Sequence, residues 1–64
     1  MIDILPNIGE QWIHHNGRVY EVVLIANVDS VNEHYPITVI YKGQNGRIWS
    51  KQLDNFLSKM KKIM

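Results

Sequence analysis

Two Asn-Gly pairs, Asn16-Gly17 and Asn45-Gly46, lie between short runs rich in β-branched and aromatic residues. Asn-Gly tolerates positive φ at both central positions of a type I′ turn, and the twist of that turn matches two antiparallel strands. The flanking runs are typical of strands. The predicted strands are residues 10–15, 18–26, 37–42 and 47–50. The sequence therefore predicts two β-hairpins, joined by a polar loop over residues 27–35.

The second predicted strand is apolar on both of its faces. Alternation places Tyr20, Val22, Leu24 and Ala26 on one face and Val19, Glu21, Val23 and Ile25 on the other. A strand of this kind is buried on both sides. We therefore expect its second face to be covered by another part of the chain or by another molecule.

The C-terminal segment changes period. Its apolar residues are Leu53, Phe56, Leu57, Met60 and Ile63. This spacing predicts an amphipathic α-helix over residues 51–63, with Ser50 or Asp54 as its N-cap. We expect the helix to pack on the Val19, Val23 and Ile25 face of the second strand. A helix lying on a membrane surface is the competing interpretation, and it is disfavoured because this apolar face is available within the chain.

The length of 64 residues allows one domain, with an arm at 1–8, a barrel at 9–50 and the helix at 51–63. The absence of cysteine excludes disulfides and thiolate zinc sites. The chain has neither an apolar run of membrane-spanning length nor a secretory signal at its N-terminus. The expected location is therefore the cytoplasm.

Charge is distributed unevenly along the chain. Residues 1–35 carry five carboxylates and one arginine, a balance of −4, whereas residues 36–64 carry six cations and one carboxylate, a balance of +5. The sum is the net charge of +1. The basic half favours an anionic partner or, more simply, forms a solvated lysine face on the helix.

No catalytic, metal-binding or cofactor-binding motif is present. His14 and His15 are adjacent on a predicted strand and should point to opposite faces, so they are not expected to share a metal ion. Ser30, Ser50 and Ser58 are not in a nucleophile motif. We therefore expect a protein that is not an enzyme and that uses no cofactor.

Aromatic side chains are the best candidates for partner contacts, because small β-domains use them either as core or as stacking and peptide-gripping surfaces. We predict Tyr20 and Trp49 in the core, and Trp12 and Tyr35 at least partly exposed. The candidate partner-binding residues are Trp12, His14, Tyr35, Lys42, Arg47 and Lys51.

The order and spacing of residues along the chain resemble those of a known group of proteins. The pattern is Trp12-x-His14-x-Asn16-Gly17-x-x-Tyr20-x-Val22, then Tyr35-Pro36-x-Thr38-Val39-x-Tyr41-x-Gly43-x-Asn45-Gly46-x-x-Trp49, then Leu53 and Phe56. It resembles short proteins of unknown function encoded by bacteriophages and prophages, and is similar to a bacterial group of small β-rich domains. That bacterial group has Arg-Pro where this chain has Lys51-Gln52. The resemblance implies an SH3-like small barrel and brings no established activity.

The expected fold is mainly β (α+β): a four-stranded antiparallel, SH3-like partial barrel of two hairpins with a C-terminal amphipathic helix. The expected function is that of a small, non-enzymatic phage accessory protein. It would act as a protein-binding module that modifies or inhibits a host or defence protein. The alternative is a nucleic-acid-binding domain that uses the basic C-terminal half. A homodimer is compatible with both.

Overall fold

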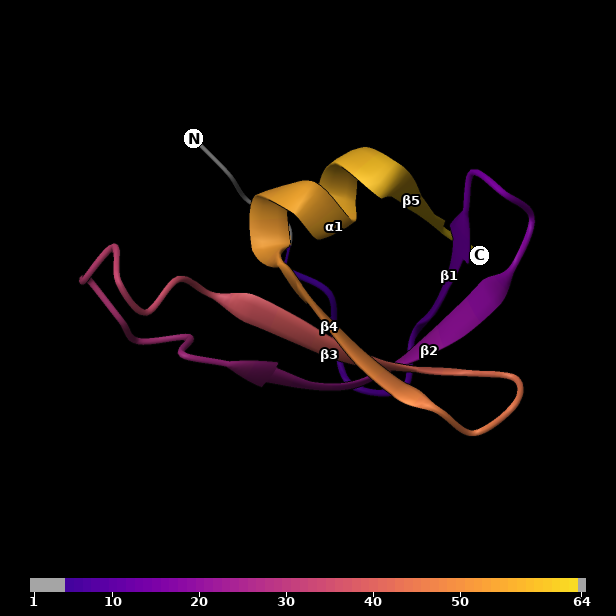
Figure 1. Cartoon of the computed structure of the whole chain (residues 1–64), viewed down its shortest axis with the longest axis horizontal. Helices are drawn as coiled ribbons and strands as arrows, with labels where there is room; N and C mark the ends of the chain where they lie inside the picture. Colours follow the sequence, from indigo (N-terminus) through magenta and orange to yellow (C-terminus); the bar gives the residue numbers. More distant parts are fainter. Residues whose placement is uncertain (1–4, 64) are drawn as a thin grey trace.

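The computed structural model describes residues 5–63, which form one antiparallel sheet of five strands and one short helix (Figure 1). The elements are β1 (Gln11–His14), β2 (Val19–Ala26), β3 (Thr38–Gly43), β4 (Ile48–Gln52), α1 (Leu53–Lys59) and β5 (Met60–Lys62). The strand order is β4-β3-β2-β1-β5. The expected mainly β class is confirmed, whereas the count of four strands is wrong because the C-terminal residues add a fifth.

Both Asn-Gly pairs form hairpin turns, but the turns are not of type I′. Only the glycines have positive φ, +93° at Gly17 and +84° at Gly46. In the first turn, His14 N–H donates to Arg18 C=O and Gly17 N–H donates to His14 C=O, both at 2.8 Å. This is a three-residue loop closed by a glycine bulge. The asparagine instead uses its side chain: Asn16 Oδ1 accepts from Arg18 N–H at 2.9 Å.

A β-bulge in the middle of β2 changes which residues share a face. Val22 pairs with Tyr41, but Leu24 pairs with Ile40, so Val23 has no partner on β3. The alternation therefore shifts by one residue, and Ile25 joins Val22 on the inner face. Leu24 turns outward and is 43% exposed. The expected division of β2 into two continuous apolar faces is wrong for this reason.

The predicted helix over residues 51–63 is too long. Residues up to Gln52 belong to β4, and α1 ends at Lys59, after which β5 pairs with β1. Without β5, β1 would leave a row of unpaired backbone groups on its second side, and pairing satisfies them. The N-cap is Gln52, which makes no side-chain cap hydrogen bond, so neither Ser50 nor Asp54 has that role.

The core lies between α1 and the inner face of the curled sheet. Phe56 is fully buried, with its ring centroid 5.1 Å from Trp12 and 5.5 Å from Tyr41. The remaining core residues are Val22, Val39 and Met60, with Tyr20, Ile25, Leu53 and Leu57 packed at its margin. The helix thus covers the face that carries Val22, not the face with Val19 and Val23 that the sequence favoured.

The N-terminal arm predicted at 1–8 falls partly outside the described residues. Within residues 5–8, Pro6 is fully buried. Asn7 N–H donates to Glu10 Oε1 at 2.9 Å, across the turn at Gly9. Described residues of the arm are therefore tied to the domain. Within residues 5–63, the single helix α1 is not long and apolar enough to cross a membrane.

Candidate partner-binding site on strand β4

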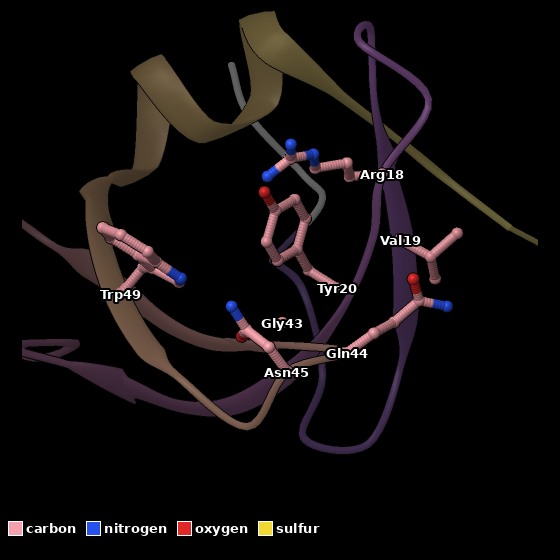
Figure 2. A pocket seen from close by; sticks show the side chains of 7 residues that line it. All are labelled: Arg18, Val19, Tyr20, Gly43, Gln44, Asn45 and Trp49. Carbon is pink, nitrogen blue, oxygen red and sulfur yellow. The ribbon is translucent and has the colours of Figure 1, made fainter.

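An open pocket lies between the tip of the β3–β4 hairpin and the start of β2 (Figure 2). Its lining residues are Arg18, Val19, Tyr20, Gly43, Gln44, Asn45 and Trp49. The volume of about 220 Å³ is below the ≈300 Å³ at which small-molecule sites begin. The pocket is therefore sized for one side chain of a larger partner rather than for a cofactor.

Gly43 determines the position of the Tyr20 ring in this pocket. The two residues are cross-strand partners, and a Cβ at Gly43 would lie 3.3 Å from Tyr20 Cε1. The missing side chain lets the ring lie over the β3 backbone. There Tyr20 packs edge-on against Tyr41, with ring centroids 5.1 Å apart. One side of the pocket is thus anchored to the aromatic core, and Arg18 extends toward the hydroxyl end of Tyr20 in Figure 2.

Trp49 forms the opposite side of the pocket and is 47% exposed. The prediction that it lies in the core is wrong, because β4 is an edge strand of the sheet. The sequence did contain a signal for this exposure. Trp49 shares its face with Lys51, two residues along the strand, and a lysine on that face indicates access to water.

The backbone of β4 is paired on one side only among the described residues. Gly43 N–H donates to Arg47 C=O at 2.9 Å, and Leu53 N–H donates to Ile37 C=O at 2.9 Å. Bonded and non-bonded pairs alternate between these two points. Trp49 and Lys51 therefore bond to β3, while the backbone groups of Ile48, Ser50 and Gln52 point away from it. The C=O of Gln52 is used by α1, because the N-cap residue accepts the first hydrogen bond of the helix. Strand β4 presents a free hydrogen-bonding edge beside the pocket.

The surroundings of β4 are cationic. Lys42, Arg47 and Lys51 belong to the β3–β4 hairpin and its turn, and the chain has no carboxylate between Glu33 and Asp54. In the part of the chain that the structure describes, the single ion pair joins Lys62 to Glu10, at 3.1 Å. Arg47 and Lys51 are therefore available to an anionic partner, whereas Lys42 lies opposite Glu21 on the outer face of the sheet.

The six predicted binding residues are divided among three regions. Lys42, Arg47 and Lys51 lie together on the β3–β4 hairpin. Tyr35 is exposed, as expected, at 61%, but belongs to the β2–β3 loop, which extends to the left in Figure 1 while the β3–β4 turn lies on the right.

Trp12 is core, contrary to the expected partial exposure. It is only 5% exposed, with its indole Nε1–H donating to Glu10 Oε1 at 3.1 Å. The reason is the C-terminal segment: Phe56 of α1 packs on the Trp12 ring, and β5 pairs with β1 beside it.

His14 lies at the end of β1, away from the pocket. The strand ends at this residue, so His15 begins the turn, and the two rings lie side by side with centroids 4.1 Å apart. The expectation of opposite faces is therefore wrong. Partial burial lowers the pKa of His14, and repulsion from His15 and Lys51 lowers it further. Within residues 5–63, no group of three or more His, Cys, Asp or Glu side chains is arranged to hold a metal ion.

The pocket and the free edge of β4 meet at Trp49, whose side chain lines the pocket and whose neighbours expose their backbone. This arrangement suits recognition of a chain-like ligand with one bulky side chain. Comparison with protein-family models, curated proteins and solved structures finds no match to this chain.

Proposed function

We propose that this protein is a non-enzymatic protein-binding module that recognises its partner through β4 and the adjacent Tyr20–Trp49 pocket. The observation that carries this proposal is the position of Trp49. A large aromatic side chain stands half exposed at the rim of a pocket of one-side-chain size, on a strand with a free edge. Tryptophan and tyrosine are enriched among the residues that dominate binding energy at protein interfaces.

An SH3-like architecture fits this role. It is supported by the meander of β1 to β4, by the short helix α1, and by the return of β5 to pair with β1. Such small barrels serve many unrelated functions, so the architecture does not by itself select one. The argument for binding rests on the site.

The cellular location and role that we propose follow from the resemblance to phage-encoded proteins. We place the protein in the cytoplasm of a bacterial host, as an accessory factor that modifies or inhibits a host or defence protein. The exposed apolar side chains Ile48 and Trp49, next to Arg47 and Lys51, are suited to masking a surface of such a partner.

Affinity capture from host lysate tests the proposal, with bound proteins identified by mass spectrometry. The same protein should be captured by the wild type and by Tyr35→Ala, which removes an exposed aromatic side chain in the β2–β3 loop. Trp49→Ala should lose it. Capture that depends on Tyr35 and not on Trp49 would place the interface elsewhere. Capture that is indifferent to both would contradict the proposal.

Binding of single-stranded nucleic acid is a second candidate, favoured by one specific observation. Arg18 lines the pocket with Tyr20 and Trp49, and Arg47 and Lys51 lie two residues to either side of Trp49 along the chain. Stacking of bases on aromatic rings beside cations is how single strands are bound without sequence preference. Nucleic acid should then be found in the wild-type eluate. Retardation of an oligonucleotide should weaken steeply with salt.

A further inference from the structure

We propose that the free edge of β4 accepts an acidic, extended polypeptide segment as an additional strand of the sheet. This inference rests on the proposed function, and it names the partner chemistry and the mode of binding. Addition of a strand uses main-chain hydrogen bonds for affinity and alternate side chains for specificity.

The backbone provides the first step of the argument. Ile48, Ser50 and Gln52 direct their N–H and C=O groups away from β3, as the alternation between the Gly43–Arg47 and Ile37–Leu53 hydrogen bonds requires. No described strand pairs with Ile48 and Ser50 on this side, whereas Gln52, as the N-cap of α1, keeps only its N–H for a partner because its C=O accepts the first hydrogen bond of the helix. An extended segment aligned with β4 would bond to both groups of Ile48 and Ser50 and to the N–H of Gln52.

The side chains beside the edge define what the segment should carry. Trp49 and Lys51 are on the inner face of β4, and Ile48, Ser50 and Gln52 are on the outer face. A residue of the added strand next to Trp49 can pack an apolar or aromatic side chain against the indole, on the side of that ring away from the pocket. The residue two positions away on the same face lies beside Lys51, where a carboxylate is favourable.

Charge selects between the possible occupants of the edge. A second copy of the chain pairing through β4 would bring two hairpins together, each carrying Lys42, Arg47 and Lys51 and no carboxylate between Glu33 and Asp54. Like charges on adjacent strands are destabilising. An acidic segment removes this repulsion. Nucleic acid would satisfy the same cations, but it would not form a ladder with the three outward backbone positions.

Peptide selection tests the proposal with a defined probe. A displayed library of random peptides of about ten residues, the upper length of common strands, is selected on the wild-type protein. The selected peptides should be enriched in Asp and Glu and should contain an apolar or aromatic residue at a fixed spacing. Their affinity should fall roughly tenfold or more with Trp49→Ala, the scale of a dominant interface residue, and should be unchanged with Tyr35→Ala.

Two measurements test the added strand itself. On peptide binding, the amide hydrogens of Ile48, Ser50 and Gln52 should exchange more slowly with solvent, while those of β5 should not change. Ser50→Pro removes an outward N–H and leaves the pairing with β3 intact, because proline is tolerated where the N–H of an edge strand faces solvent. This variant should weaken binding by about tenfold, the effect of roughly one to two hydrogen bonds.

Charge reversal tests the acidic preference. Arg47→Glu combined with Lys51→Glu should abolish binding of the acidic peptides, whereas Lys61→Glu on β5 should leave it within about twofold because that strand is at the other edge.

The possible failures are distinguishable. Trp49-dependent peptides without acidic enrichment, or without protection of the β4 amides, would overturn this inference and leave the protein-binding function standing. Failure to select any peptide, together with Trp49-dependent binding of an oligonucleotide, would overturn both.

Discussion

Strands β4 and β5 are the two edges of the same sheet, and they differ in length, charge and hydrogen bonding. β5 has three residues, two of them lysines, and Lys62 is paired with Glu10. Its outward N–H at Met60 already donates to Phe56 C=O at the end of α1. β4 has five residues, of which Ile48 and Ser50 expose both backbone groups and Gln52 exposes its N–H, and it carries the half-exposed Trp49.

Proteins protect sheet edges with short strands, with lysines and by covering them. All three devices are present at β5: it is short, it is lysine-rich and its first residue is bonded to α1. β4 has lysine only at Lys51, on the inner face. The comparison indicates that one edge is protected against association and the other is left competent for pairing, which is why we place the binding surface on β4.

The largest expected effect concerns the protected edge. Phe56→Ala removes the fully buried ring that lies between Trp12 and Tyr41, and such substitutions cost about 3–5 kcal/mol of unfolding free energy. Because α1 leads directly into β5, amide exchange should accelerate more at β5 than at β4 in this variant. Leu57→Ala, at a half-buried position of the same helix, should cost less in urea unfolding. If amide exchange accelerated equally at β4 and β5, the proposed difference between the two edges would be contradicted.

A second variant disturbs β4 and spares β5. Gly43→Ala places a Cβ 3.2 Å from Asn45 Oδ1 and 3.3 Å from Tyr20 Cε1, so the ring and the hairpin tip must shift. Because the ring is half-buried and Asn45 is exposed, the cost should be about 1 kcal/mol, the lower end of the range for overpacking. We expect lower stability in denaturant unfolding and altered chemical shifts at Trp49, with Met60 to Lys62 unchanged. Gln44→Ala in the same turn is the control and should be close to the wild type.

A third, smaller effect is the pH dependence of the β5 edge. The pKa of Glu10 is lowered to about 2, chiefly by the backbone N–H of Asn7, while Lys62, the Asn7 side chain and Trp12 act in the same direction against desolvation. Its ionised form therefore stabilises the fold fully above the ordinary pKa of 4.5, and this contribution is lost as pH falls toward 2.

Glu10→Gln should accordingly lower stability near pH 7 by up to about 1 kcal/mol, the range of partly exposed pairs, and match the wild type near pH 2. Urea titrations at several pH values measure the difference. Glu33→Gln, in the exposed β2–β3 loop, is the control and should keep wild-type stability at pH 7. A difference between Glu10→Gln and the wild type that persists at pH 2 would argue against the ionised carboxylate of Glu10 as its source.

The smallest effect on stability should come from removing the charges beside β4. Arg47→Thr with Lys51→Thr should change unfolding by less than about 0.5 kcal/mol, as surface substitutions do. It should nevertheless promote self-association, because the repulsion between two β4 edges is reduced. Sedimentation over a concentration series measures this. The control variant that combines Lys59→Thr with Lys61→Thr should remain as monomeric as the wild type. If this control self-associated and the β4 variant did not, our assignment of the protected and the free edge would be reversed.

Local signals in the sequence were sufficient for much of the sheet. The Asn-Gly pairs and the apolar runs around them located four strands to within about two residues, because turn chemistry and strand propensity act over a few neighbours. The exposure of Tyr35 and the gathering of Lys42, Arg47 and Lys51 on one hairpin also follow from sequence position.

The remaining errors arise from interactions between distant segments. The bulge at Val23 is set by pairing with β3, and local alternation contains no sign of it. The helical spacing of Met60 and Ile63 is overridden by pairing with β1, which also buries Trp12. The site on β4 was missed for a related reason: Trp49 is exposed because β4 is an edge strand, a property of the strand order.

The return of β5 to β1 has a consequence for the way this chain folds. Trp12 and Lys62 are partners although they are 50 positions apart (62 minus 12), whereas Gly43 and Arg47 meet across a turn of three residues. Contacts between distant positions require the intervening chain to lose its freedom first, and they slow folding. The β3–β4 hairpin can therefore form early and by itself. Pairing of β5 with β1 should form late, because it requires most of the intervening chain to be folded.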